Sequence, residues 1–171
     1  MLTVACGAAA PPAKGESPKQ VEGLTVVPGP GPAVRSTYPA AGGTVPGGTL
    51  ILKIVFDQPM TPKAWAYGRS AEGDFPDCLA DPRLLNDQRT YVLLCSVDSN
   101  RVYAIEINPT PRFADAYGRS AQPYVLKFST NDAEITRGLH DALLQAGLDD
   151  TDNPIMTWRD PGQGVSQSPA P

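Results

Sequence analysis

The chain has 171 residues, of which 41% are hydrophobic and 19% charged, so it can form one globular domain with flanking segments but not two large domains. Its formal net charge of -4, without a stripe of Lys and Arg in the sequence, argues against nucleic-acid binding, which relies on such clusters to contact phosphates. The 19 prolines and 16 glycines exceed the share in an average protein, and most of the excess lies near the two ends, which we therefore expect to be tails.

Residues 1–33 are predicted to be a flexible tether that begins with a lipidation signal. In LTVACG a small residue directly precedes Cys6, which resembles the end of a bacterial lipoprotein signal, where the cysteine carries the lipid. Thr3 stands where that signal has an aliphatic residue, and the basic segment that begins such a signal is missing. A start codon assigned too late would explain the missing segment. The following Pro, Ala and Gly would hold a domain away from a membrane. The alternative is an incidental cysteine in a disordered leader.

The cysteine count points to an oxidising compartment. If Cys6 carries lipid, Cys78 and Cys95 remain as one pair. The periplasm or the cell surface would allow this pair to form a disulfide, whereas two buried free thiols are the alternative. The sequence thus predicts a membrane-anchored lipoprotein of the cell envelope or periplasm.

Short apolar segments separated by Gly and Pro turns predict an all-β domain over residues 34–131. The clearest segment is TLILKIVFD at 49–57, where apolar residues occupy both faces, as in a central strand. No helical pattern separates the strands, so we expect an antiparallel Ig-like β-sandwich of about seven strands. The other candidate strands are 34–38, 65–69, 90–96, 102–107 and 123–130.

One amphipathic helix is predicted after the last strand, over residues 132–148. Asn131 is the expected N-cap, Glu134 completes a capping box, and Gly147 ends the apolar pattern. The apolar face of this helix could pack on the sandwich or on a partner. Residues 149–171 are expected to be a disordered tail, apart from the short apolar segment IMTW at 155–158.

Two segments resemble bacterial Ig-like domains of the kind found in SbsA-type surface-layer and other envelope proteins. TYPAAGGTVPGGTLILKIVFDQPM contains the Pro-x-x-Gly turn, the apolar strand and the Phe-Asp-x-Pro-Met end of that family. RVYAIEI and DAYGRSAQPYVLKFST match its tyrosine-led strand, its Asp-x-x-Gly turn and its final strand. The resemblance covers residues 34–131 except 65–89, and it implies an Ig-like sandwich in a small cell-envelope lipoprotein. We interpret Tyr103 as a tyrosine corner, whose hydroxyl bonds to the backbone.

The hexapeptide AYGRSA occurs twice, at 66–71 and 116–121, with unrelated flanking residues. A repeat architecture would need similarity over a whole supersecondary unit, so the sequence does not support one. The second copy is predicted to be the Asp-x-x-Gly turn before the last strand, and the first a loop or an edge strand. Two similar turns, each using a glycine for backbone freedom, would account for both copies.

Catalytic and metal-binding patterns are weak in this sequence. The two Gly-Arg-Ser segments resemble half of a nucleophile elbow, so a small serine hydrolase using Ser70 or Ser120 with His140, the only histidine, is an alternative. We expect His140 on the solvent side of the terminal helix. The acidic run at 149–153 lacks the glycine and the glutamate of a calcium loop, so no metal and no cofactor are predicted.

The remaining hypothesis is recognition. Trp65, Tyr67, Arg69, Tyr117 and Arg119 fall in or near predicted loops, and their residue types often anchor binding hot spots. The alternative is that the aromatic rings pack in the domain and the two arginines are only solvated, without a role in binding. We expect a non-enzymatic binding or structural module, lipid-anchored, whose partner is an unknown envelope protein or glycan. A further alternative is an accessory subunit that docks through the 132–148 helix.

Overall fold

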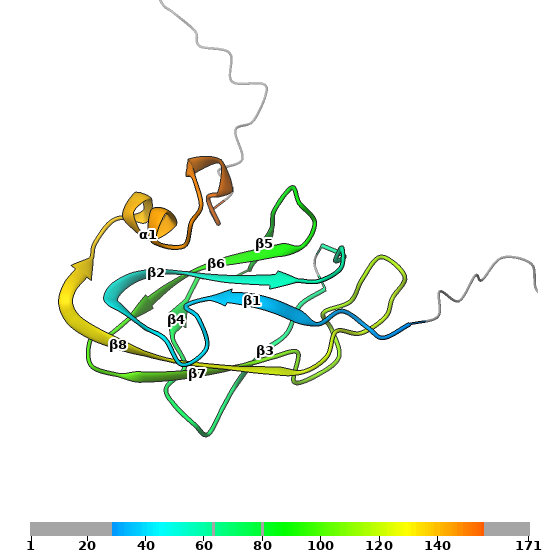
Figure 1. The fold of residues 1–171 in the computed structure, drawn as a ribbon, viewed down its shortest axis with the longest axis horizontal. Helices are drawn as coiled ribbons and strands as arrows, with labels where there is room; N and C mark the ends of the chain where they lie inside the picture. The colour runs from blue at the N-terminus through cyan, green and yellow to red at the C-terminus, as the bar shows by residue number, and fades with distance from the viewer. Residues whose placement is uncertain (1–28, 63, 80, 156–171) are drawn as a thin grey trace, which may run out of the picture.

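The computed structural model describes residues 29–62, 64–79 and 81–155, which build a two-layer β-sandwich with a short helix on one outer face (Figure 1). The predicted tether up to residue 28, with Cys6, lies outside the described residues, as does most of the predicted tail. Within the described ranges, no helix is long and apolar enough to cross a membrane.

The first layer is built around β2 (Thr44–Phe56), the strand that contains the apolar run. β1 (Val34–Tyr38) and β6 (Thr90–Val97) pair antiparallel with β2. Two short strands, β4 (Asp77–Cys78) and β5 (Arg83–Leu84), then pair with β6 and form one broken edge strand.

The second layer consists of β3 (Tyr67–Arg69), β7 (Val102–Ile107) and β8 (Tyr124–Thr136), paired antiparallel in that order. With β4 and β5 counted as one strand, the seven strands divide between the layers as in a constant-type Ig domain. The predicted fold class, an Ig-like β-sandwich with a C-terminal helix, is confirmed.

One strand pair is parallel, so the sheet is mixed rather than purely antiparallel. The first residues of β2 pair with β8 and join the two layers at one end. Gly48 makes this bend possible, because its φ is +103° and a Cβ there would overlap the carbonyl oxygen of Thr136. Only glycine fits at this position without moving the backbone of β8.

Alternating residues of both layers fill the core between them. Phe56, Tyr91 and Phe113 form an aromatic centre, with ring centroids 5.0 to 6.1 Å apart. The surrounding apolar residues come from β2, β6, β7 and β8, as their period of two requires. They include Leu50, Leu52, Ile54, Leu93, Ile105, Ile107, Leu126 and Phe128.

Two predicted features stabilise the sandwich. The hydroxyl of Tyr103 accepts a hydrogen bond of 2.7 Å from the backbone N–H of Asp98, which confirms the tyrosine corner. Cys78 and Cys95 form the predicted disulfide, which joins β4 to β6 across 17 residues of sequence. Closing a loop of this length contributes about 3 kcal/mol in the chain-entropy view.

The helix is shorter than predicted, because β8 continues to Thr136 and α1 covers only Leu139–Gln145. The expected N-cap, Asn131, therefore lies within a strand, and Gly138 occupies the N-cap position without a side-chain cap. Pairing with β2 explains the difference, since it engages residues 129–131 and Thr136 in the sheet, where a helix would have to satisfy their backbone groups internally.

α1 covers the outer face of the first layer. Its residues Ala142, Leu143 and Ala146 are buried against Ile51 and Val92 of the sheet. The ammonium group of Lys53 donates a hydrogen bond to the carbonyl oxygen of Ala146, at the end of the helix. A 3-10 turn, η1 (Asp150–Asp152), follows α1. The apolar face of the helix thus packs on its own sandwich.

Candidate functional site

Two of the five predicted binding residues, Trp65 and Tyr67, are partly buried and pack against the core. The ring of Tyr67 is 5.3 Å from that of Phe113 and 6.0 Å from that of Trp65. Burial, with a smaller contribution from Tyr91, raises the pKa of Tyr67 far above its usual value. The Tyr67 hydroxyl has no hydrogen-bond partner among the described residues. These contacts agree with the packing alternative for Trp65 and Tyr67.

Tyr117 and Arg119 belong to a turn organised by the buried carboxylate of Asp115. One oxygen accepts backbone hydrogen bonds from Tyr117 (2.9 Å) and Arg119 (2.8 Å), and the other accepts from Nε of Arg119 (2.6 Å). Burial alone would raise the pKa of Asp115, but these hydrogen bonds and the Arg119 charge outweigh it and lower the pKa. Gly118, at φ +78°, completes the predicted Asp-x-x-Gly turn. Tyr117 remains 69% exposed.

The two motifs of the family resemblance meet at this turn. Met60, the last residue of FDQPM, pairs with Asp115, and the hydroxyl of Thr61 donates to the Asp115 carbonyl oxygen. Arg119 donates from Nη2 to Oε1 of Gln58 at 2.6 Å. The FDQPM end and the Asp-x-x-Gly turn are therefore parts of one structural corner, and Arg119 serves that corner.

Among the described residues, His140 forms no hydrogen bond with Ser70 or Ser120. Nδ1 of His140 lies 2.9 Å from a carboxylate oxygen of Asp150, at the exposed side of α1. The hydroxyl of Ser120 accepts from Nδ2 of Asn108, and that of Ser70 from the backbone N–H of Glu72. The hydrolase alternative thus lacks the base that it requires. The described residues also include no group of three His, Cys, Asp or Glu side chains placed to hold a metal ion.

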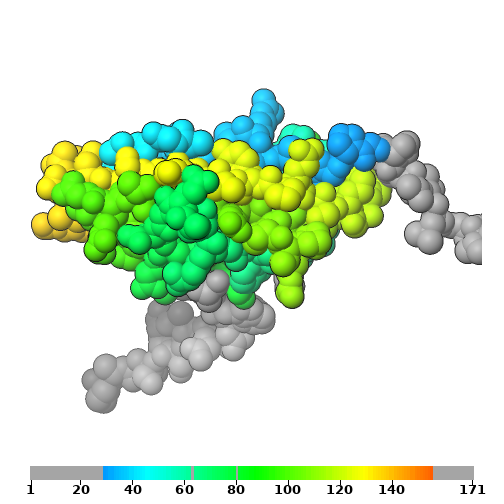
Figure 2. Space-filling model, turned by 90° about the horizontal axis from the view of Figure 1, so that it is seen from below, coloured from blue at the N-terminus to red at the C-terminus, as the bar shows by residue number. Residues whose placement is uncertain are grey.

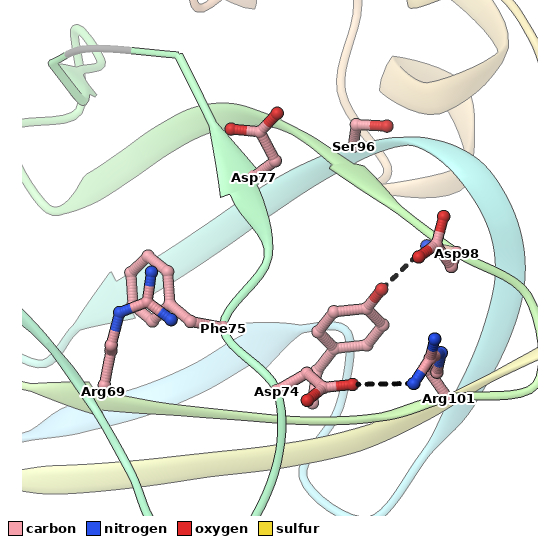
Figure 3. Close-up of a pocket in the computed structure, with 8 residues that line it drawn as sticks. Arg69, Asp74, Phe75, Asp77, Ser96, Asp98 and Arg101 are labelled. Carbon is pink, nitrogen blue, oxygen red and sulfur yellow. Dashed lines mark hydrogen bonds and ion pairs between the residues drawn. The ribbon is translucent and has the colours of Figure 1, made fainter.

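The fifth predicted residue, Arg69, lines a polar cleft of about 480 Å³ near the corner between β6 and β7 (Figure 3). One wall is the segment between β3 and β4, which crosses from the second layer to the first. In Figure 2 this green segment protrudes from the surface beside β7 and β8. The cleft is lined by Arg69, Asp74, Phe75, Asp77, Ser96, Asp98, Arg101 and Tyr103.

Backbone contacts hold this crossing segment against β7. The N–H of Asp74 donates to the carbonyl oxygen of Val102, and the N–H of Ala104 donates to that of Asp74, both at 2.9 Å. Gly73 permits the approach, because a Cβ there would lie 2.9 Å from backbone atoms of β7. The cleft wall is therefore supported by the sheet itself.

The charges that line the cleft are only loosely paired. Nη1 of Arg101 lies 3.5 Å from a carboxylate oxygen of Asp74, with both side chains more than half exposed. The Arg69 guanidinium lies 5.3 Å from the centre of the Phe75 ring, within the range of a cation–π contact. Asp77 and Asp98 form no ion pair with another described residue. These groups can hydrogen-bond a polar ligand that carries hydroxyl or charged groups.

Of the residues that line the cleft, the sequence pointed only to Arg69 as a binding residue. Asp98 falls between the predicted strands 90–96 and 102–107, while Asp74 and Asp77 fall in the segment 65–89, which the family resemblance does not cover. The bridge between Asp74 and Tyr103 is what brings these segments together. The tyrosine corner at Tyr103 was the one sequence signal that marked this end of the sandwich.

Comparison with known proteins identifies no family for this chain. No protein-family model matches it, and neither does any curated protein. Among solved structures, the S-layer protein rSbsC(31-844) is similar over 58% of this chain, with 13% identity and a TM-score of 0.40. The chain spans only 14% of that protein's length.

An Ig-domain complex of titin M10 with a mutant of obscurin-like 1 is similar over 61% of this chain and 91% of the other chain. Its identity is 13% and its TM-score 0.26. Because both TM-scores are low, the fold assignment rests on the strand order and the tyrosine corner described above.

Proposed function

We propose that this chain is a non-enzymatic binding module of the bacterial cell envelope, lipid-anchored through Cys6. The Pro- and Gly-rich tether holds the Ig-like sandwich away from the membrane, and the polar cleft beside Arg69 and Arg101 contacts a glycan of the envelope. The surface-layer family resemblance of the sequence motifs agrees with this location.

The disulfide is the observation that carries the proposal. Cys78 and Cys95 are joined, which is typical of proteins outside the reducing cytosol. Their pairing accounts for two of the three cysteines and leaves Cys6, in its lipoprotein-like sequence, for another role. A lipid on this cysteine fits the oxidising compartment that the disulfide requires.

The cleft supports the binding role. It combines two guanidinium groups, three carboxylates and two hydroxyl groups on walls that the sheet holds in place. A glycan presents hydroxyl groups that can donate to the carboxylates and accept from the guanidinium groups of such a surface. The side chains are exposed, so we expect weak binding that depends on several contacts together.

Metabolic labelling with a palmitate analogue tests the anchor. Expressed from its native locus, the protein should incorporate the label, and Cys6→Ser should abolish it. Cys78→Ser is the control, since it removes a cysteine of the disulfide and should leave labelling intact. Label that persists in Cys6→Ser, or an unlabelled wild type, contradicts lipid attachment.

Co-sedimentation with isolated peptidoglycan sacculi tests the cleft. The full chain carrying Cys6→Ser should sediment with the sacculi, and the additional double change Arg69→Ala with Arg101→Ala should weaken binding about tenfold, which corresponds to about 1.4 kcal/mol. The matched control is Arg112→Ala with Arg137→Ala, which removes the same charge from exposed arginines outside the cleft. Equal loss in both double variants would indicate non-specific charge attraction and contradict a role for the cleft.

A further inference from the structure

The charged side chains of the polar cleft are sorted by layer. On the first-layer side, Asp77 of β4 and Ser96 of β6 are directly opposite residues, so their side chains lie on the same face (Figure 3). Asp98 follows directly after β6. On the second-layer side, Arg69 is the last residue of β3, and Arg101 directly precedes β7. One side of the cleft therefore offers carboxylates and the other guanidinium groups.

The ion pair between Arg101 and Asp74 leaves the other charges of the cleft uncompensated. Among the described residues, Asp74 and Arg101 pair only with each other, at 3.5 Å. Arg69 forms no ion pair with a described carboxylate. Asp77 and Asp98 likewise form none with a described cation. One guanidinium group and two carboxylates thus remain available to a ligand.

This arrangement discriminates between classes of ligand. A neutral glycan that covered Asp77 and Asp98 would take water from both carboxylates without supplying a counter-charge, which costs free energy. A polyanion would compensate Arg69, but it would also bring like charges next to the two carboxylates. An ammonium group compensates the carboxylates, and a carboxylate compensates Arg69. A ligand that carries both groups is therefore the one that matches the cleft.

We propose that the cleft binds a zwitterionic part of an envelope glycan, in which a free amine and a carboxylate lie close together. The amine contacts Asp77 and Asp98, the carboxylate contacts Arg69, and the hydroxyl of Ser96 can donate to or accept from either group. The cleft volume of about 480 Å³ suits a ligand of this size. This inference rests on the proposed function, glycan binding in the cleft, and specifies the chemistry of the ligand.

Blocking the amines of the ligand tests the acidic side of the cleft. Peptidoglycan sacculi, whose peptides carry free amines and carboxylates, are compared before and after N-acetylation, with the full chain carrying Cys6→Ser as the reference protein. Acetylation should weaken co-sedimentation of this protein about fivefold. The additional double change Asp77→Asn with Asp98→Asn should weaken binding to untreated sacculi to a similar extent, and should make binding insensitive to acetylation.

The matched control is Glu134→Gln with Asp141→Asn, which removes the same charge from exposed carboxylates outside the cleft. This control should keep the full response to acetylation. Urea unfolding verifies that both double variants fold as the reference protein does. A reference protein that binds both kinds of sacculi equally, or the same response to acetylation in both double variants, would overturn the proposal.

Blocking the carboxylates of the sacculi as methylamides tests the basic side. This treatment should weaken binding of the reference protein about fivefold. Arg69→Ala should abolish that response, whereas Arg112→Ala, an exposed arginine outside the cleft, should keep it. Binding that survives both blocking reactions would overturn the zwitterionic ligand but not glycan binding. No binding to untreated sacculi would overturn both.

Discussion

The buried side chain of Asp115 organises the turn that follows it. It is only 3% exposed, and its carboxylate accepts three hydrogen bonds from the turn that follows. Removing it would leave two N–H groups and the Arg119 guanidinium without their acceptor. The sequence predicted this turn from its Asp-x-x-Gly pattern, but it did not predict that the Arg119 guanidinium would bond to the Asp115 carboxylate.

We expect Asp115→Ala to lower the free energy of unfolding by about 3 kcal/mol, because several hydrogen bonds to one buried carboxylate are lost together. Urea unfolding measures this change. Asp77→Ala, an exposed carboxylate without an ion pair among the described residues, is the control and should change stability by less than about 0.5 kcal/mol. A similar loss in both variants would contradict the role given to Asp115.

The same residue should make stability depend on pH. The folded-state pKa of Asp115 is lowered, so its contribution is complete above the unfolded value of about 3.9 and is lost as the pH falls through the folded value. The stability difference between wild type and Asp115→Ala should therefore be constant near neutral pH and shrink below about pH 4. A difference that stays constant in acid would show that the carboxylate charge is unimportant.

His140 provides a second pH-dependent group. The hydrogen bond and the charge of Asp150 raise the pKa of His140 above its usual value, although the side chain is exposed. A raised folded pKa stabilises the protein below the unfolded pKa, and this contribution is lost as the pH rises through the folded value. An NMR titration should show a His140 midpoint above about 6.5, and Asp150→Asn should lower it. An unchanged midpoint in Asp150→Asn would refute the pair.

At the scale of elements, the parallel contact between β2 and β8 depends on one glycine. Gly48→Ala combines a positive φ with a backbone clash against Thr136, so we expect a loss of about 3 kcal/mol or more. Gly42→Ala is the control, since Gly42 has φ +72° but nothing within 4 Å of an added Cβ, and should cost only about 1 kcal/mol. Thermal unfolding distinguishes the two. Equal losses would mean that backbone strain alone, and not the close approach of β8, requires glycine at 48.

The disulfide is the other element-scale contribution, because it holds the short β4 on the edge of β6. Replacing both Cys78 and Cys95 by alanine should reduce the free energy of unfolding by about 3 kcal/mol, as measured in urea. Alkylation of either cysteine in the native protein without a reductant would show free thiols instead.

The helix shows where local sequence signals fail. The capping residues at 131 and 134 predict a helix from 132, yet β8 extends through them. A capping box is worth only about 1 kcal/mol, whereas the paired strand satisfies a series of backbone groups at once. Tertiary pairing therefore overrides the local preference, and the helix forms only after β8 ends.

At the scale of the whole molecule, the domain has two apolar clusters, one between the layers and one beneath α1. Leu143 is 1% exposed in the second cluster, so Leu143→Ala should cost about 2 to 4 kcal/mol, measured by chemical unfolding. Leu144→Ala, on the exposed side of the same helix, should cost less than about 0.5 kcal/mol. Equal effects would contradict the docking of α1 on the sheet.

The sequence by itself determined the strands with period two, the tyrosine corner, the Asp-x-x-Gly turn and hence the sandwich, because each depends on residues close together in the chain. The sequence also predicted the disulfide between Cys78 and Cys95, because these two cysteines remain if Cys6 carries lipid. The cleft could not be foreseen, since its walls come from segments that only the folded chain brings together.

The two copies of AYGRSA show what only the tertiary structure decided. In the first copy Tyr67–Arg69 is an edge strand on β7, and its tyrosine ring packs against Phe113 of the core. In the second, Gly118 adopts a positive φ in a turn, and Tyr117 is exposed. The prediction of a loop or an edge strand for the first copy is thus confirmed as an edge strand, and the interpretation as two similar turns was wrong for that copy. Six residues carry too little local preference to fix their backbone, so the neighbouring β7 selects a strand in one place and the buried Asp115 selects a turn in the other.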